Sequence, residues 1–314
     1  MSDDTDNFET VVKNTGTEAV AQFANTKKGF LPRLQHALHV NPALVPLFVL
    51  MASIAVFGLL LGSKFFSPFA LTLILQQVQI VGIVAAAQSL VILTAGIDLS
   101  VGAIMVLSSV VMGQFTFRYG LPVELAIVMG LITGMVCGYI NGWLVAVMKL
   151  PPFIVTLGMW QIVLATNFLY SANETIRAQE IEQNAPLLQV FATKFEVGGA
   201  VLTVGVIFMV LLMLVLSYAL KQTAWGRHVY AVGDDPEAAQ LSGVNVRRTL
   251  ISVYVLSGLI CAFAGWALIG RIGSVSPTSG QLANIESITA VVIGGISLFG
   301  GRGSILGALF GALI

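Results

Sequence analysis

Charged residues are scarce in this 314-residue chain. Asp, Glu, Lys and Arg together make up 10% of it, whereas a soluble domain carries about 25%. Hydrophobic residues reach 57% and the mean hydropathy is +0.92. Because so much apolar surface cannot be hidden in a water-soluble core, the composition predicts an integral membrane protein. The formal net charge is zero, and no basic patch favours nucleic acid as a partner.

Catalytic and metal-binding motifs are also missing. The two cysteines, Cys137 and Cys261, lie inside apolar runs and indicate small buried residues, with neither a disulfide framework nor a metal site. No G-x-x-x-x-G-K-[ST] occurs, and "GGRGS" lacks the lysine. H-E-x-x-H, G-x-S-x-G and C-x-x-C are absent as well. We therefore predict no catalytic residue and no metal or cofactor in this chain; if ATP drives the protein, another chain binds ATP and Mg²⁺.

The chain is rich in long apolar runs, which suit helices better than the roughly 10-residue alternating strands of a barrel. They predict an all-α, polytopic transmembrane helix bundle of about 8–10 spans, some interrupted or re-entrant. The last run stops while still apolar, and we expect the natural chain to continue beyond it. The runs lie at 43–62, 70–94, 99–117, 123–147, 152–172, 200–220, 250–270, 288–299 and 304–314.

Two parts of the chain can be distinguished. Residues 1–42 are polar and of mixed charge, and Leu31, Leu34 and Leu38 share one face of a short helix expected at the membrane surface. Residues 43–314 form the expected membrane domain. With the N-terminus in the cytoplasm, 173–199 becomes a periplasmic loop and 221–249 a cytoplasmic one. Nine of the 15 Lys and Arg residues then lie inside and five outside, as the positive-inside rule favours.

One carboxylate interrupts the apolar stretch "LVILTAGIDLSVGAIMVL". Asp98 is the only charged residue between Lys64 and Arg118, and such a residue is costly in lipid. In one reading Gly96 ends a helix and Asp98, with Ser100 nearby, caps the next one. In another, Asp98 lines a polar route through the bundle for a hydroxylated solute. A proton relay is a third reading, for which Glu124 is the only other acid in reach.

Amides and an aromatic ring support the polar route. Gln77 and Gln88 are 11 residues apart and so share a helix face, with Gln76 and Gln79 beside them. Asn167 adds an amide in a neighbouring span. Amides bond hydroxyl groups and a flat ring covers C–H groups, which suits a neutral polyol or sugar. The alternative for each amide is hydrogen bonding between helices. The predicted pathway residues are Gln77, Gln88, Asp98, Ser100, Asn141, Trp160 and Gln161.

Small residues recur at the spacing of helix contacts. Glycines every fourth residue form stripes that let membrane helices approach closely, either within one subunit or between two copies. In addition, "GIDLSVGA" at 96–103 is echoed by "GISLFGGRG" at 295–303, and paired interrupted segments are typical of the binding route of a transporter. The stripes consist of Gly130, Gly134, Gly138 and Gly142, and of Gly303, Gly307 and Gly311.

The cytoplasmic loop at 221–249 contains signals for a short helix. Asp235 is a good N-cap, Pro236 suits the first helical position and Gly243 suits a left-handed stop. A helix this short needs support from its flanks or from a partner. It is either a docking element for a soluble subunit or an ordinary loop helix folded against its own bundle. The docking residues would be Asp235, Pro236, Glu237, Ala238, Ala239, Gln240, Leu241, Ser242 and Gly243.

Four motifs carry a family resemblance: "ILTAGIDLSVGAIM", "KLPPFIVTLGM", "GRHVYAVGDDPEAAQLSGVNV" and "GGISLFGGRGSILGALFGALI". The chain resembles the permease subunits of bacterial ABC importers for ribose, xylose, arabinose, galactose and fructose, and is most similar to the fructose type. The resemblance implies a second permease copy, a cytoplasmic ABC ATPase, a periplasmic sugar-binding protein and the bacterial inner membrane. It maps 235–246 onto the ATPase-docking segment and "GIDLSVG" onto a motif near the pathway. Where relatives often have Arg-Gly, this chain has Thr166-Asn167.

The function predicted from these observations is import of a monosaccharide by alternating access, with ATP hydrolysed by a separate chain. The main alternative is an ion-coupled secondary transporter of a small polar solute that uses Asp98 as its coupling carboxylate. A membrane scaffold or enzyme without transport is the remaining alternative.

Overall fold

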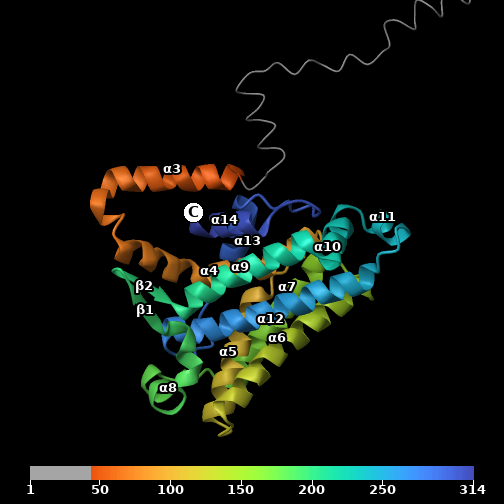
Figure 1. Ribbon diagram of the computed structural model, residues 1–314. Helices are drawn as coiled ribbons and strands as arrows, with labels where there is room; N and C mark the ends of the chain where they lie inside the picture. Colours follow the sequence, from red (N-terminus) through yellow and green to blue (C-terminus); the bar gives the residue numbers. More distant parts are fainter. Residues whose placement is uncertain (1–43) are drawn as a thin grey trace, which may run out of the picture. The chain divides into compact units, whose positions relative to one another are not determined.

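The computed structural model describes residues 44–314, which are mostly helical (Figure 1). The tail at 1–42 and its expected interfacial helix lie outside the described residues. The α-helices are α3 (Leu44–Leu61), α4 (Pro68–Leu93), α5 (Val101–Phe117), α6 (Val123–Ala146), α7 (Pro152–Ser171), α8 (Ala178–Asn184), α9 (Val204–Gln222), α10 (Ala224–Asp234), α11 (Pro236–Leu241), α12 (Val246–Ile272), α13 (Ala283–Ile293) and α14 (Ile305–Leu313). Short 3₁₀ helices are η1 (Gly62–Lys64) and η2 (Pro186–Ala192), and the strands are β1 (Lys194–Val197) and β2 (Ala200–Thr203).

Six of these helices are long and apolar enough to cross a membrane: α3, α4, α6, α7, α9 and α12. Two apolar helices, α5 and α13, are shorter, and each follows an irregular segment. The prediction of an all-α, multi-pass membrane protein with interrupted spans is therefore confirmed. The predicted run at 288–299 had the wrong bounds, because its helix begins at Ala283 and ends at Ile293.

The first glycine stripe lies in the contact between α6 and α12, the most extensive helix pair of the described chain. A methyl group on Gly134 would meet the backbone of Gly258, and one on Gly138 would meet the carbonyl oxygen of Tyr254. Gly142 is less crowded, since a methyl group there would lie 3.0 Å from the Cα atom of Ile251. These glycines therefore let two helix backbones of the same chain touch, as small residues do between membrane helices. Gly130, at the other end of the stripe, lies against Met112 of α5.

The second stripe is shorter than the sequence suggested. Gly311 of α14 lies against the backbone of α13 at Ala290, and the carbonyl of Gly307 lies close to Gly294. Gly303 is not part of this helix contact, because α14 begins only at Ile305. Gly303 instead has φ +135°, and a side chain there would collide with Ile296.

The two ends of the bundle carry different elements (Figure 1). The hairpin of β1 and β2 lies with α8 at one end, and α10 and α11 lie at the other. The strands pair antiparallel, with Lys194 opposite Thr203. Both predicted loops contain regular structure: 173–199 contains α8, η2 and β1, and 221–249 contains α10 in addition to the predicted short helix.

The irregular segments before α5 and after α13 share one type of helix ending. After α4, Ala95 takes a left-handed conformation at φ 59°, and the amide of Gly96 donates to the carbonyl of Val91 at 3.0 Å. After α13, Gly295 takes that conformation, and Ile296 donates to Val291 at 3.2 Å. Ala95, not Gly96, therefore provides the left-handed stop that we had assigned to Gly96. The similarity of the two sequence segments is matched by the same backbone motif, displaced by one residue.

Candidate functional site

Asp98 lies inside the bundle, in the irregular segment between α4 and α5, with 2% of its surface exposed. Its Oδ1 atom accepts hydrogen bonds from the backbone amide of Ser100 at 2.8 Å and from the Ser100 hydroxyl at 2.6 Å. The Nδ2 group of Asn141, on α6, donates to the same hydroxyl at 2.9 Å. Three of the predicted pathway residues are thus joined in one buried network. Among the described residues, no group of three or more His, Cys, Asp or Glu could hold a metal ion.

The structure changes the capping role that we expected for Asp98. Helix α5 begins at Val101. The backbone amide of Ser100, which donates a hydrogen bond to Asp98, therefore lies just outside the helix. The amide of Gly102, one of the free donors of the first turn, is accepted instead by Oδ1 of Asn284 at 2.6 Å. Asn284 comes from the first turn of α13, so the starting ends of the two short helices meet inside the bundle.

A cavity of about 280 Å³ opens at this meeting point. Its walls come from α5, α7, the segment that precedes α13, and α13 itself. Trp160 lies on the α7 side with Asn167, and Asn284 lies opposite on α13. Asn167 is 1% exposed; its Nδ2 group donates to the carbonyl of Pro277 at 2.9 Å, and its buried Oδ1 atom has no partner. The remaining lining residues are Gly102, Ala103, Val106, Leu164, Pro277, Ser279, Gly280, Gln281, Leu282 and Ile285.

Two residues of this cavity were missing from the predicted pathway set. Asn167 is an amide of its predicted span but is not one of the predicted pathway residues. Asn284 lies before the predicted run at 288–299, because the helix begins earlier, at Ala283. The sequence does contain a signal for this helix start. Asn284 precedes Glu286 and Ser287 and an apolar run, and asparagine is favoured where helices begin.

The predicted glutamines do not gather at the cavity. Gln77 is exposed, and its Oε1 atom accepts a hydrogen bond from the guanidinium of Arg271. Gln76 donates to the carbonyl of Val201 at 2.7 Å, and Thr203 donates to Gln79 at 3.1 Å. The amide-rich stretch at 76–79 therefore ties α4 to the hairpin and to the end of α12.

Gln88 and Gln161 also differ from expectation. Gln88 is fully buried and both of its amide atoms lack a partner, but it does not line the cavity. Although Gln77 and Gln88 share a helix face, about 16 Å of helix separates them. Gln161 lies on the exposed side of α7, facing away from its neighbour Trp160. Of the seven predicted residues, only Trp160 touches the cavity.

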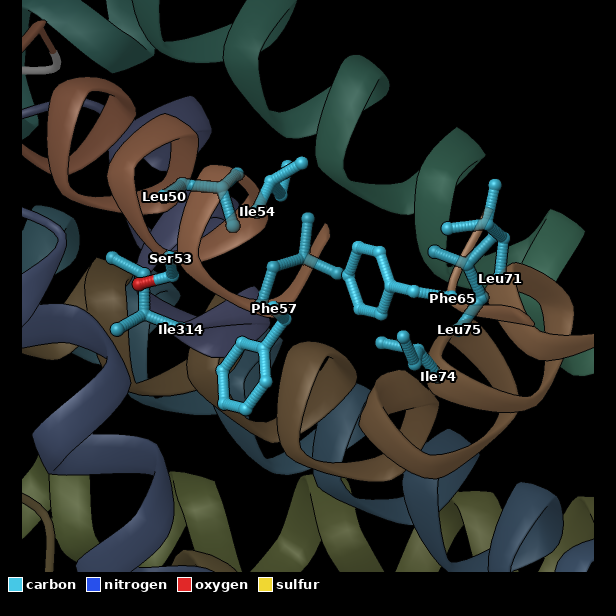
Figure 2. Close-up of a pocket in the computed structure, with 10 residues that line it drawn as sticks. Leu50, Ser53, Ile54, Phe57, Phe65, Leu71, Ile74, Leu75 and Ile314 are labelled. Atoms are coloured by element: carbon cyan, nitrogen blue, oxygen red, sulfur yellow. The ribbon is translucent and has the colours of Figure 1, made fainter. Parts of the chain in front are cut away.

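A second cavity, of about 460 Å³, lies between α3, α4 and the end of α14. Figure 2 shows side chains of α3, such as Leu50 and Phe57, facing Ile74 and Leu75 of α4 across it. Ser53 is the only residue in its lining with a polar side chain. This surface offers almost no hydrogen bonds to a hydroxylated solute and matches hydrocarbon instead.

The predicted docking helix is present as α11. Oδ1 of Asp235 accepts hydrogen bonds from the amides of Glu237 and Ala238 at 2.9 and 3.0 Å, and Gly243 is left-handed at φ 85°. Every residue of 235–243 is exposed except Ala239, and Leu241 is 90% exposed. The helix therefore packs on its own chain only through Ala239 and leaves its other side chains exposed. A polar groove of about 630 Å³ runs beside it, with Lys149 and Arg247 in its lining.

Helix α10 connects this end to both irregular segments. A methyl group on Gly233 would collide with the carbonyl of Leu93 and lie 2.7 Å from the amide of Gly301. The hydroxyl of Tyr230 donates to the carbonyl of Gly303 at 2.9 Å. Burial raises the pKa of the Tyr230 phenol, which keeps the hydroxyl protonated as a donor. Helix α10 therefore contacts the segments that precede α5 and α14, and it is followed directly in the chain by α11.

Comparison with known proteins identifies the family. Residues 70–314 match the family described as "Branched-chain amino acid transport system / permease component". The chain belongs to this permease family. It is 71% identical to the fructose import permease of Rhizobium meliloti over 307 residues. This alignment covers 98% of this chain and 85% of that protein. No solved structure matches the chain.

More distant relatives of the permease are also named for sugars. The ribose import permease of Bacillus subtilis is 38% identical over 268 residues, which is 85% of this chain and 80% of that protein. The xylose transport system permease of Escherichia coli K12 is 33% identical over 294 residues, which is 77% of this chain and 75% of that protein. The resemblance to sugar permeases inferred from the four motifs is thereby confirmed.

Proposed function

We propose that this chain is the permease subunit of an ATP-driven importer that moves a monosaccharide across the bacterial inner membrane. The observation that carries the proposal is the 71% identity to a fructose import permease over 98% of the chain. The cavity between α5, α7 and α13 supports it, because its few amides and its tryptophan suit a hydroxylated ring. Fructose is the first candidate substrate, and ribose the second.

The chain hydrolyses no ATP itself in this proposal. A cytoplasmic ABC ATPase binds ATP and Mg²⁺ and docks on the exposed segment 235–243, while a periplasmic sugar-binding protein docks on elements of 173–199. A second copy of the permease completes the membrane part. Each partner shifts the balance between outward-open and inward-open states only by its different affinity for the two. In this orientation the N-terminus, α10 and α11 are cytoplasmic, and β1 and β2 are periplasmic.

Uptake into proteoliposomes tests the function. The permease is reconstituted with its ATPase and binding protein, and radiolabelled fructose is supplied with the binding protein on one side and ATP on the other. We expect uptake that requires ATP and survives an ionophore that collapses ion gradients. Vesicles with ADP in place of ATP are the matched control.

Three results are informative in this assay. Uptake that is lost with the ionophore and independent of ATP would establish the ion-coupled alternative with Asp98. Uptake of neither fructose nor ribose by an assembled complex would overturn the importer. ATP-dependent uptake of ribose alone would keep the importer and change its substrate.

A further inference from the structure

The cavity between α5, α7 and α13 has a mainly apolar lining with a few unpaired hydrogen-bonding groups. The first-turn amides of a helix have no intrahelical partner. Among the described residues, the amides of Ala103 on α5 and of Asn284 and Ile285 on α13 have no hydrogen-bond acceptor, and all three residues line the cavity. Two helix starts therefore present donors to one space.

A side-chain acceptor belongs to a residue of the same lining. Oδ1 of Asn167 is buried and has no hydrogen-bond partner among the described residues, which costs free energy unless a ligand or water supplies one. The other end of this amide is held by the carbonyl of Pro277, so the free oxygen has a defined position. An unpaired, buried acceptor beside unpaired donors is the pattern of a site built for a ligand that both donates and accepts.

The lining also defines the charge of that ligand. Within residues 44–314, no acidic or basic side chain lines the cavity. A buried charge needs a partner, so an ammonium group would find no carboxylate here. Helix starts favour oxygen atoms that carry partial negative charge, and hydroxyl groups supply such oxygens as well as protons for Asn167. The half-buried indole of Trp160 adds a flat face for C–H groups.

We infer that this cavity is a specific binding site for a single neutral sugar ring inside the permease, an inference that rests on the proposed function. Asn167 accepts a hydrogen bond from a sugar hydroxyl, the amides of Ala103 and Ile285 donate to sugar oxygens, and Trp160 covers one face of the ring. At about 280 Å³ the cavity is just below the range of about 300–1,000 Å³ typical of small-molecule pockets, so it selects monosaccharides over larger sugars. The permease thus takes part in selectivity instead of leaving it to the binding protein.

Protection of an introduced cysteine tests the site in the assembled complex. Ser279 lines the cavity and is half-buried, so Ser279→Cys is labelled with a small thiol reagent with and without fructose. Cys137 and Cys261 are buried, and the unmodified protein serves as the labelling blank. Thr166→Cys is the matched control. Thr166 is next to Asn167 in the chain, but it lies on the exposed side of α7 and does not line the cavity. We expect fructose to slow labelling of Ser279→Cys and to leave labelling of Thr166→Cys unchanged.

Removing the acceptor adds a second measurement. Asn167→Ala in the Ser279→Cys protein should raise the fructose concentration needed for protection by about 5- to 10-fold, the effect of one lost hydrogen bond. Thr166→Ala is the matched control and should leave this concentration unchanged. If Asn167→Ala does not reach the membrane, Trp160→Ala takes its place with the same expected direction.

The possible results separate the site from the function. If the unmodified complex imports fructose while fructose never protects Ser279→Cys, the site is overturned and the importer stands. Protection by gluconate with none by fructose would overturn the assignment of a neutral ligand. If the unmodified complex imports no sugar, the proposed function itself fails.

Discussion

Oδ1 of Asn284 accepts a hydrogen bond from the backbone amide of Gly102 at 2.6 Å, across 182 residues of sequence. The contact joins the first turns of two short helices, α5 and α13, beside the cavity that α7 also lines. Gly102 allows this approach, because a methyl group there would lie 2.6 Å from the same oxygen. The bond acts as an N-cap supplied by a distant helix, and it positions one wall of the cavity.

Loss of this cap should destabilise the protein. We expect Asn284→Ala to lower the free energy of unfolding by about 1–2 kcal/mol, because a buried amide of α5 loses its acceptor. The measurement is thermal unfolding of the purified permease in detergent. Gln281→Ala, an exposed neighbour without a hydrogen bond among the described residues, should change stability by less than about 0.5 kcal/mol. Equal stability of both variants would refute the capping role.

Asp98 can be tested as an acceptor and as a charge. Asn at this position retains an oxygen for the two donors of Ser100, so Asp98→Asn should reach the membrane at the normal level and keep ATP-driven uptake. Asp98→Leu leaves both donors unpaired and should cost about 2–3 kcal/mol of stability. Membrane abundance and uptake are measured together. A normally inserted Asp98→Asn protein without uptake would show that the charge itself is needed.

Gly96 has a steric reason to lack a side chain. A methyl group there would lie 2.9 Å from the hydroxyl of Tyr254, which is buried and has no hydrogen-bond partner in the part of the chain that the structure describes. Gly96→Ala should therefore destabilise the permease by about 1–3 kcal/mol. Tyr254→Phe removes the obstructing oxygen and should restore much of this loss in the double variant. Additive effects in thermal unfolding would rule out the proposed contact.

The contacts of α10 predict a coupling defect. Gly233→Ala places a methyl group against Leu93 and Gly301, and should separate α10 from both irregular segments. We expect less sugar imported per ATP hydrolysed, with the ATPase still bound. Tyr230→Phe removes only the hydrogen bond to Gly303 and should show a smaller loss in the same direction. His228→Ala, on the exposed side of α10, is the control. An unchanged ratio of uptake to hydrolysis in Gly233→Ala would contradict the prediction.

The exposed end of α11 predicts where the ATPase binds. Deletion of 235–243 should abolish co-purification of the ATPase while membrane insertion stays intact. Leu241→Asp is a milder test, because this side chain is 90% exposed and its replacement adds charge without removing a contact of the bundle. It should weaken co-purification by about 10-fold or more if Leu241 is buried in the interface. Ser242→Ala is the neighbouring control, and retention of the ATPase by the deletion variant would refute docking.

Local patterns in the sequence were enough for the membrane class and for several elements. Long apolar runs predict spanning helices because the bilayer sets their length. Asp235, Pro236 and Gly243 predict α11 because capping depends on neighbours within one or two turns. The glycine spacing of α6 predicts a close helix contact, although not its partner, α12. The buried bond from Asn141 to Ser100 joins two residues that had both been selected for the pathway.

Residues that meet only through tertiary structure could not be predicted in this way. Amides of α4 bond a hairpin that is remote in sequence, and Trp160 and Gln161 are neighbours in the chain that face opposite environments. The cavity depends on the meeting of Gly102, Asn167 and Asn284, which lie on three helices. Composition and the length of the apolar runs determined that this chain is a multi-pass helical membrane protein. Local capping residues determined its short exposed helix. Only the packing of α5, α7 and α13 decided where donors and acceptors converge, because hydrogen-bond partners far apart in sequence are fixed by the fold.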